Sequence, residues 1–126
     1  MKRGEFTLAT QAGNKGYFGK VAIEVEAAHD ITGKVEVDFD AEHARRWQIG
    51  ARFGIQSVLD HVPRKRTFPT GARIHVTSIQ GHEVDTNEVV IAFAAANALL
   101  RALEIGPSEI RKPDLDTEQG LFVFPK

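Results

Sequence analysis

One segment of the chain, residues 89–103, is apolar on nearly every side when it is drawn as a helix. Asp85 and Glu88 form an Asp-x-x-Glu capping box ahead of it, and Gly106-Pro107 supplies a stop signal behind it. A helix without a polar face has to be covered on all sides. The segment therefore predicts a central helix around which the core of a layered domain is built.

A second helical pattern comes earlier in the chain. Apolar residues step by three and four from Ala44 to Val62, and Asp40 is placed to cap the start of this helix. Gly50 and Gly54 lie inside the pattern, at a cost of about 1 kcal/mol each relative to alanine. Their spacing indicates either a close approach to a sheet or a helix that begins only near Arg45.

Several segments alternate apolar and polar residues, as half-buried strands do. They are residues 6–9, 20–27, 35–39 and 73–80, followed by shorter candidates at 109–112 and 121–124 on either side of an acidic linker at 114–118. The order of strands, helix, strand, helix and one or two strands predicts an α+β fold. We expect a two-layer sandwich, with a mixed or antiparallel sheet and two helices on one face.

The composition excludes several classes of protein. The chain has 126 residues, enough for one domain, and its formal net charge of −1 gives no overall attraction to nucleic acid or anionic membranes. It has no cysteine, which excludes disulfides, zinc fingers and thiol nucleophiles. The longest apolar run, residues 89–96, is too short to cross a bilayer, and no apolar leader follows Lys2 and Arg3. We expect a cytoplasmic protein without a membrane partner.

Three glycines, at positions 13, 16 and 19, lie in the stretch from Gln11 to Val21. A phosphate-binding P-loop requires Gly-Lys-Ser/Thr, but Gly19-Lys20 is followed by valine. A dinucleotide fingerprint has unequal glycine spacings and opens a helix, whereas these glycines are evenly spaced and precede a strand pattern. The stretch is interpreted as a hairpin loop, and we expect no nucleotide or other cofactor.

Three short segments match the motifs of one family. Residues 82–88 read His-Glu-Val-Asp-Thr-Asn-Glu, close to the family's His-Asp-Val-Asp-Ser-Ser-Glu before a long apolar helix, and Gly-Ile-Gln recurs at 54–56. The glycine stretch fits the motif Gln-Thr-Gly-Gly-x-Gly-Gln-Tyr-Gly-x-Val at five positions, namely Gln11, Gly13, Gly16, Gly19 and Val21. Together these segments resemble the fourth domain of translation elongation factor G.

The resemblance covers roughly residues 5–112 and implies that domain's fold, a split β-α-β sandwich with a four- to five-stranded sheet and a left-handed crossover. It implies one domain over residues 1–112, with residues 113–126 as an extension that packs on it or extends it. Several features depart from the family. The GTPase domain and the fifth domain are not matched, and residues 38–43 are acidic where the family is glycine-rich. Asn14 replaces a tip glycine, and the extension from Asp114 is not the family's. We therefore do not expect a translocase, or any enzyme.

In the family, two loops of this domain form a tip that enters the decoding region of the small ribosomal subunit and contacts RNA. The match places these loops at residues 14–16 and 81–83. Glycine lets a backbone approach phosphate closely, and lysine supplies charge. The ribosome or another structured RNA is the partner that the resemblance implies, and the candidate RNA-binding residues are Asn14, Lys15, Gly16, Lys20 and His82.

Other interpretations stay open. A protein–protein interaction module that kept the fold and lost RNA binding fits the near-neutral charge. No nucleophile–base pair stands out, so no catalytic residue is assigned, and His75 is interpreted as a surface residue. A group of potential metal ligands is interpreted as a solvated acidic face without a metal: His29, Asp30, Asp38, Asp40 and His43.

Overall fold

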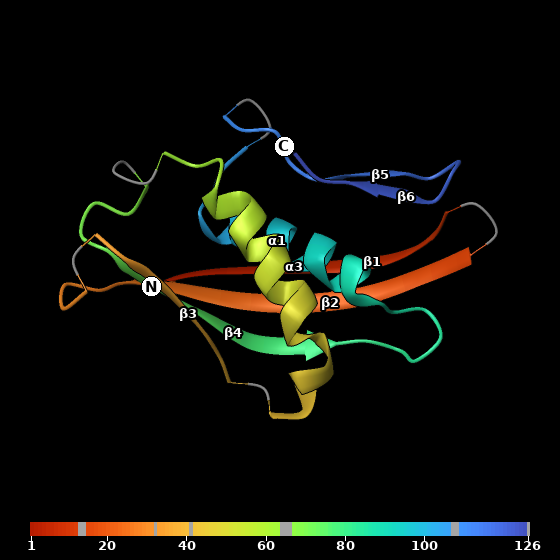
Figure 1. The fold of residues 1–126 in the computed structure, drawn as a ribbon, viewed down its shortest axis with the longest axis horizontal. Helices are drawn as coiled ribbons and strands as arrows, with labels where there is room; N and C mark the ends of the chain where they lie inside the picture. Colours follow the sequence, from red (N-terminus) through yellow and green to blue (C-terminus); the bar gives the residue numbers. More distant parts are fainter. Residues whose placement is uncertain (13–14, 32, 41, 64–66, 107–108, 126) are drawn as a thin grey trace.

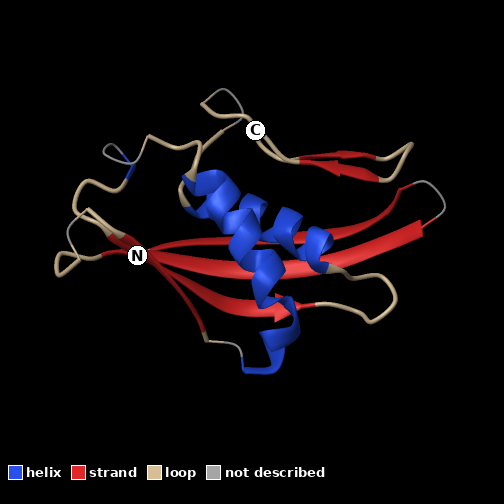
Figure 2. Cartoon of the chain, in the orientation of Figure 1, coloured by secondary structure: helices blue, strands red, loops and turns tan. Residues whose placement is uncertain are grey.

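The structure is a computed structural model that describes the whole chain except residues 13–14, 32, 41, 64–66, 107–108 and 126. Two helices lie in one layer over a four-stranded sheet, and a small two-stranded sheet lies beside them (Figures 1 and 2). In chain order the elements are β1 (Lys2–Ala12), β2 (Lys15–Ala27), β3 (Val35–Phe39), the 3-10 helix η1 (Glu42–Trp47), α1 (Gln48–Leu59), β4 (Ala72–Gln80), α3 (Glu88–Ala102), β5 (Asp114–Asp116) and β6 (Leu121–Val123).

The main sheet has the strand order β1-β2-β4-β3. The β1–β2 and β2–β4 pairs are antiparallel, whereas β3 and β4 run parallel and are connected through α1. In Figure 1, α1 lies on the viewer's side of the sheet, and the crossover connection from β3 through α1 to β4 is left-handed. Such connections between parallel strands are usually right-handed. The architecture confirms the predicted split β-α-β sandwich with two helices on one face.

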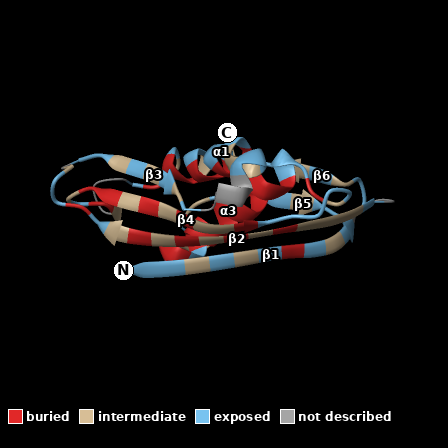
Figure 3. Cartoon of the chain, turned by 90° about the horizontal axis from the view of Figure 1, so that it is seen from below, coloured by how far each residue is buried: buried red, intermediate tan, exposed pale blue. Residues whose placement is uncertain are grey.

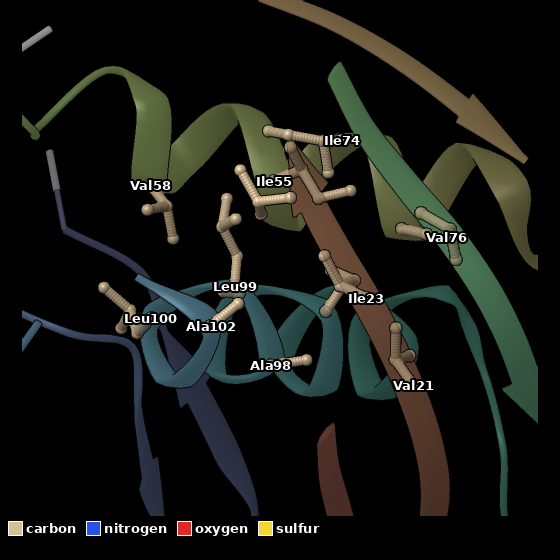
Figure 4. Packing of buried hydrophobic residues seen from close by; sticks show 14 of the residues in the cluster. Val21, Ile23, Ile55, Val58, Ile74, Val76, Ala98, Leu99, Leu100 and Ala102 are labelled. Carbon is tan, nitrogen blue, oxygen red and sulfur yellow. The ribbon is translucent and has the colours of Figure 1, made fainter. Parts of the chain in front are cut away.

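The core lies between the helices and one face of the sheet (Figure 3). Val21, Ile23 and Val25 of β2 are buried in alternation, as the sequence pattern predicts. Figure 4 shows Leu99 of α3 pointing toward Ile55 of α1, and both side chains are almost completely buried. The helix α3 is buried along nearly its whole length, as expected of a central helix.

The start of α3 differs from the sequence prediction. Asn87 is the N-cap, and its side chain accepts a hydrogen bond from the Val90 N–H at 2.9 Å. The predicted capping box at Asp85 and Glu88 is wrong because the Asp85 carbonyl accepts a hydrogen bond from Phe18 of β2 instead. Because of this contact with β2, α3 begins only at Glu88.

The start of α1 is also later than predicted. Asp40 does not cap it, because the Asp40 N–H still donates to the Val76 carbonyl at 3.0 Å and so continues the parallel strand ladder. The residues that follow form η1, and α1 begins at Gln48. A Cβ on Gly50 or Gly54 would collide with backbone of α3, at Glu88 and Ala92 respectively. The close approach that these glycines permit is thus to a helix and not to a sheet.

The C-terminal segment forms its own small sheet. The predicted strand at 109–112 is absent from its described residues, whereas β5 lies inside the predicted acidic linker and pairs with β6. The Phe122 ring of β6 makes edge contacts with Tyr17 and Phe93, at centroid distances of 5.2 and 5.3 Å. Phe124 makes a similar contact with Phe53 of α1 at 5.2 Å. These rings attach the small sheet to β2 and to both helices.

Within the described residues, no helix combines the length and the apolar character that a membrane crossing requires.

Candidate functional site

Two segments that are far apart in sequence meet at one end of the main sheet, on the right of Figure 1. The strand β2 extends past β4, because Gln80, the last residue of β4, pairs with Lys20. Beyond this point the loop at 81–87 takes the place of β4 beside β2, and the Phe18 N–H donates to the Asp85 carbonyl at 2.9 Å. We call residues 15–18 and 81–87 together the tip.

Thr86 holds the two parts of the tip together. Its hydroxyl donates to the Phe18 carbonyl at 2.6 Å and accepts from the His82 N–H at 2.7 Å. The Thr86 N–H also donates to the His82 carbonyl at 2.9 Å, which closes the loop on itself. Thr86 is one of the few buried polar residues, with 6% of its surface exposed, so these hydrogen bonds are shielded from water.

The side chains of the tip lie on both faces of β2, since neighbouring strand residues point in opposite directions. On one face the His82 ring packs on Phe18, with centroids 4.3 Å apart. On the other face the Lys15 ammonium lies 5.7 Å from the Tyr17 ring, which contacts Phe122 of the small sheet. The tip therefore offers an aromatic pair on one side and a cation on the other.

The structure separates the five candidate RNA-binding residues. Lys15, Gly16 and His82 lie at the tip, whereas Asn14 lies outside the described residues. Lys20 lies at the border of the tip, opposite Gln80 and on the face of the sheet opposite the helices, where its ammonium pairs with Glu5 at 3.4 Å. The strand alternation contains this information, because positions 15 and 20 differ by an odd number and so face opposite ways.

The charge of the tip is mixed. The Asp85 carboxylate lies beside Gly16, where an added Cβ would be 3.6 Å from its Oδ1. Glu83 and Glu88 are exposed nearby in sequence, and Val84 is 81% exposed.

Sequence reasoning missed Thr86 and Tyr17, because their partners are known only once the topology brings the two segments together.

The sheet face opposite the helices, which we call the open face, carries charged side chains that pair across strands. The Arg73 guanidinium donates to both oxygens of Asp30, with the shorter contact 2.6 Å, and lies 3.4 Å from Glu36. His75 lies on this face as predicted, but its side chain is only 22% exposed. The charged residues of the open face include Arg3, Glu5, Lys20, Glu24, Glu26, Glu36, Asp38, Asp40, Arg73 and His75.

These pairs shift the pKa values of three groups, lowering that of Asp30 and raising those of Arg73 and His75. The hydrogen bond from Arg73 holds the pKa of Asp30 below its usual value. Hydrogen bonds to Glu26 and then to Asp38 hold the pKa of His75 above its usual value, against the opposing effect of burial. The charged form of each group is therefore favoured by its partners.

A cavity of about 410 Å³ lies at the end of β2 away from the tip. It is bordered by the start of β4 and by residues after α3, and its apolar lining includes Val25, Phe68 and Leu103. None of the described groups with a shifted pKa lines it. The cavity and the titrating groups therefore do not combine into one site.

Comparisons with known proteins show the fold. No protein-family model matches the chain, and no curated protein matches it. Among solved structures, the chain is similar to the crystal structure of a Thermus thermophilus protein of unknown function, with a TM-score of 0.57 and 23% sequence identity. The match covers 77% of this chain and 14% of that chain, so this chain spans only a small part of the other protein's length.

Proposed function

We propose that this chain is a non-catalytic, cytoplasmic binding module of the elongation factor G domain IV type, which contacts the ribosome or another structured RNA through its tip. One observation carries the proposal. His82, in one of the two loops that the resemblance assigns to a tip, is joined through Thr86 to Phe18 of β2, two residues after the other loop and more than sixty residues away in sequence. An end built from two tied loops is already ordered before it meets a partner.

The tip has groups that suit RNA. The exposed His82 ring, supported by Phe18, offers a surface on which an unpaired base can stack. Lys15 offers a cation for phosphate, and Gly16 has no side chain of its own, although the Asp85 carboxylate lies beside it. Recognition would then combine one stacking contact with phosphate contacts.

The acidic neighbours limit the strength of this binding. Asp85 lies beside Gly16, and Glu83 precedes it in the same exposed loop. Because these carboxylates repel phosphate, and because Lys15 is the cation at the described part of the tip, we expect weak and salt-sensitive binding.

The two lysines provide a matched test, since the structure places them on opposite faces of β2. Lys15→Glu should weaken binding to ribosomal or transfer RNA by about 1–2 kcal/mol at low salt, because it replaces an attraction by a repulsion. Lys20→Glu makes the same change of charge on the opposite face of β2, at a lysine already paired with Glu5, and should alter binding less. Fluorescence anisotropy at two salt concentrations measures both variants. Equal affinity for wild type and both variants would show that Lys15 and the tip do not contact RNA.

A second test addresses the aromatic pair. His82→Ala should reduce affinity for single-stranded or looped RNA more than for a fully paired duplex, because only unpaired bases can stack on the ring. Circular dichroism and the melting temperature should stay close to those of the wild type, since the His82 side chain is exposed. A uniform loss on both kinds of RNA would contradict the stacking role.

The second candidate function is a protein-interaction module. The observation that favours it is a set of exposed large apolar side chains on the helices, the tip and β6, namely Ile49, Phe53, Val84, Val89, Leu121 and Val123. Under this alternative, the wild-type protein shows no measurable RNA affinity even at low salt. The anisotropy titration therefore separates the two functions before any variant is made.

A further inference from the structure

Four potential metal ligands, from three neighbouring strands and the residues that follow them, converge on the open face, outside the tip. They are Glu26 of β2, Asp38 of β3, Asp40 just after β3 and His75 of β4. We propose that Asp38, Asp40 and His75 form a binding site for a divalent transition-metal cation, with Glu26 orienting the imidazole.

The backbone holds the three ligands in register. Asp38 lies directly opposite His75 in the parallel β3–β4 pair. Asp40 lies two residues after Asp38, and its N–H bonds to the Val76 carbonyl, so it continues the same ladder. One ligand atom from each of the three side chains lies within 4.8 Å of the other two. Small side-chain rotations on fixed strands would bring these atoms around one cation, and rigid support of this kind is what a metal site needs.

Glu26 supplies the orientation that metal-binding histidines usually receive from a second partner. The His75 Nε2 lies 3.0 Å from the Glu26 carboxylate, and Nδ1 lies 2.6 Å from Asp38 Oδ1. If the ring loses its Nδ1 proton to solvent, the Nε2–H can still donate to Glu26. The free electron pair then lies on Nδ1 and faces Asp38, which is the carboxylate–histidine–metal arrangement of many known sites.

The balance of charge favours a cation at this place. Glu26 and Asp38 both contact His75, and Asp40 lies beside them, so three carboxylates share one imidazole. The nearest arginine along β4, Arg73, is directed to Asp30 and Glu36. No lysine or arginine of the described residues forms an ion pair with Asp38 or Asp40. A divalent ion would therefore neutralise charge that the chain leaves uncompensated.

The ligand types indicate which metals to expect. One imidazole nitrogen and two carboxylate oxygens suit Zn²⁺, Co²⁺ and Mn²⁺, whereas Ca²⁺ and Mg²⁺ prefer oxygen ligands alone. Binding replaces the Nδ1 proton of His75 by the metal and releases that proton to water. Bound metal would also link β3 to β4 through side chains, in addition to their backbone hydrogen bonds.

The test uses the full chain and each metal alone at pH 8. Isothermal titration with Zn²⁺, Co²⁺ and Mn²⁺ should show one equivalent bound, and bound Co²⁺ should show visible absorption bands. His75→Gln and Asp40→Asn should each lower the affinity at least tenfold. Glu26→Gln should lower it less, because the amide oxygen can still accept from Nε2–H.

Two control variants remove the same kinds of group elsewhere. His82→Gln removes an exposed imidazole at the tip, and Glu5→Gln removes an exposed carboxylate from the same open face. Both should bind metal as the wild type does. Asp40→Asn is the deciding variant if His75→Gln fails to fold, since the Asp40 side chain is exposed.

Two results would overturn the proposal. One is no binding of any of the three metals by the folded wild-type protein at millimolar concentration. The other is wild-type affinity in folded Asp40→Asn and His75→Gln, or a loss in the His82→Gln control as large as theirs. Either result would leave the cluster as a set of surface ion pairs.

Discussion

On the face of the main sheet that the helices cover, backbones approach one another so closely that side chains are excluded at several points. A Cβ on Gly4 of β1 would collide with the backbone of α3 at Ala98 and Ala102, and one on Gly54 would collide at Ala92. On the open face, long charged side chains such as Arg73 reach across strands and remain partly in water. Close packing fixes the covered face sterically, whereas the open face is held by interactions that can be exchanged.

The difference teaches where such a domain can acquire function. Added volume on the covered face has no place to go, because protein interiors are packed at the density of organic crystals. On the open face and at the tip, a side chain can change without displacing a neighbour. The proposed metal ligands lie on the open face, and the proposed RNA contacts lie at the tip, on both sides of β2.

The largest effect is expected for a charge placed in the covered core. Leu99 is completely buried, so Leu99→Asp should cost several kcal/mol and leave the domain unfolded at room temperature. Val89→Asp makes the same change one helix face away, at a residue that is 46% exposed, and should leave the fold intact. Circular dichroism and thermal unfolding compare the two. A folded Leu99→Asp protein with an unchanged melting temperature would contradict the central position of α3.

The next largest effect on stability is expected when a single methyl group is added at Gly54. Gly54→Ala improves helix propensity by about 1 kcal/mol, but its Cβ meets the Ala92 carbonyl, and we expect a net loss of about 1–3 kcal/mol. Gly106→Ala adds the same methyl group where nothing lies within 4 Å, and it should change stability by less than about 1 kcal/mol. Urea unfolding measures both, and a stabilised Gly54→Ala would show that α1 can shift away from α3.

The open face should respond more weakly. Arg73→Gln removes the contacts to Asp30 and Glu36, whose side chains are 66% and 52% exposed, and we expect a smaller loss of stability than for Gly54→Ala. A double-mutant cycle with Asp30→Asn isolates the pair. The coupling should shrink when salt is raised, because the pair is near water. A coupling that does not change with salt would contradict this expectation and show that the pair is shielded from water.

The smallest effect is expected at the edge strand β1. Arg3 pairs with Glu24 at 3.2 Å, but its side chain is 76% exposed, so Arg3→Ala should change stability by less than about 0.5 kcal/mol. The same unfolding measurement checks this. A larger loss would mean that charge pairing along this edge contributes more than an exposed pair normally does.

The covered face was easier to predict from sequence than the tip. Alternation identified Val21, Ile23 and Val25 as one buried face, and the unbroken apolar surface of 89–103 identified the central helix, because burial repeats with the period of each element. The helix starts were predicted wrongly at Asp40 and Asp85. Both backbones are engaged by β4 or β2, and such tertiary hydrogen bonds leave no local pattern.

The tip was predictable only in part. The resemblance brought the two loops together, and strand alternation indicates that Lys15 and Lys20 lie on opposite faces of β2. Thr86 could not be recognised, because an isolated threonine gives no sign that its partner lies 68 residues away. The His75 cluster was missed for the same reason, since its ligands come from strands that are adjacent only in the folded sheet.

The strand order also determines when the sheet can be completed as the chain is synthesised. The hairpin of β1 and β2 needs only neighbouring residues, whereas β3 pairs with β4 alone and so has no partner in the sheet until residue 80 is available. Until then, β2 also has one unpaired edge, and exposed strand edges recruit other chains. When β4 is synthesised, it pairs with β2 on one side and with β3 on the other, so it covers an exposed edge of each strand. A central strand of the sheet is therefore the last to be added.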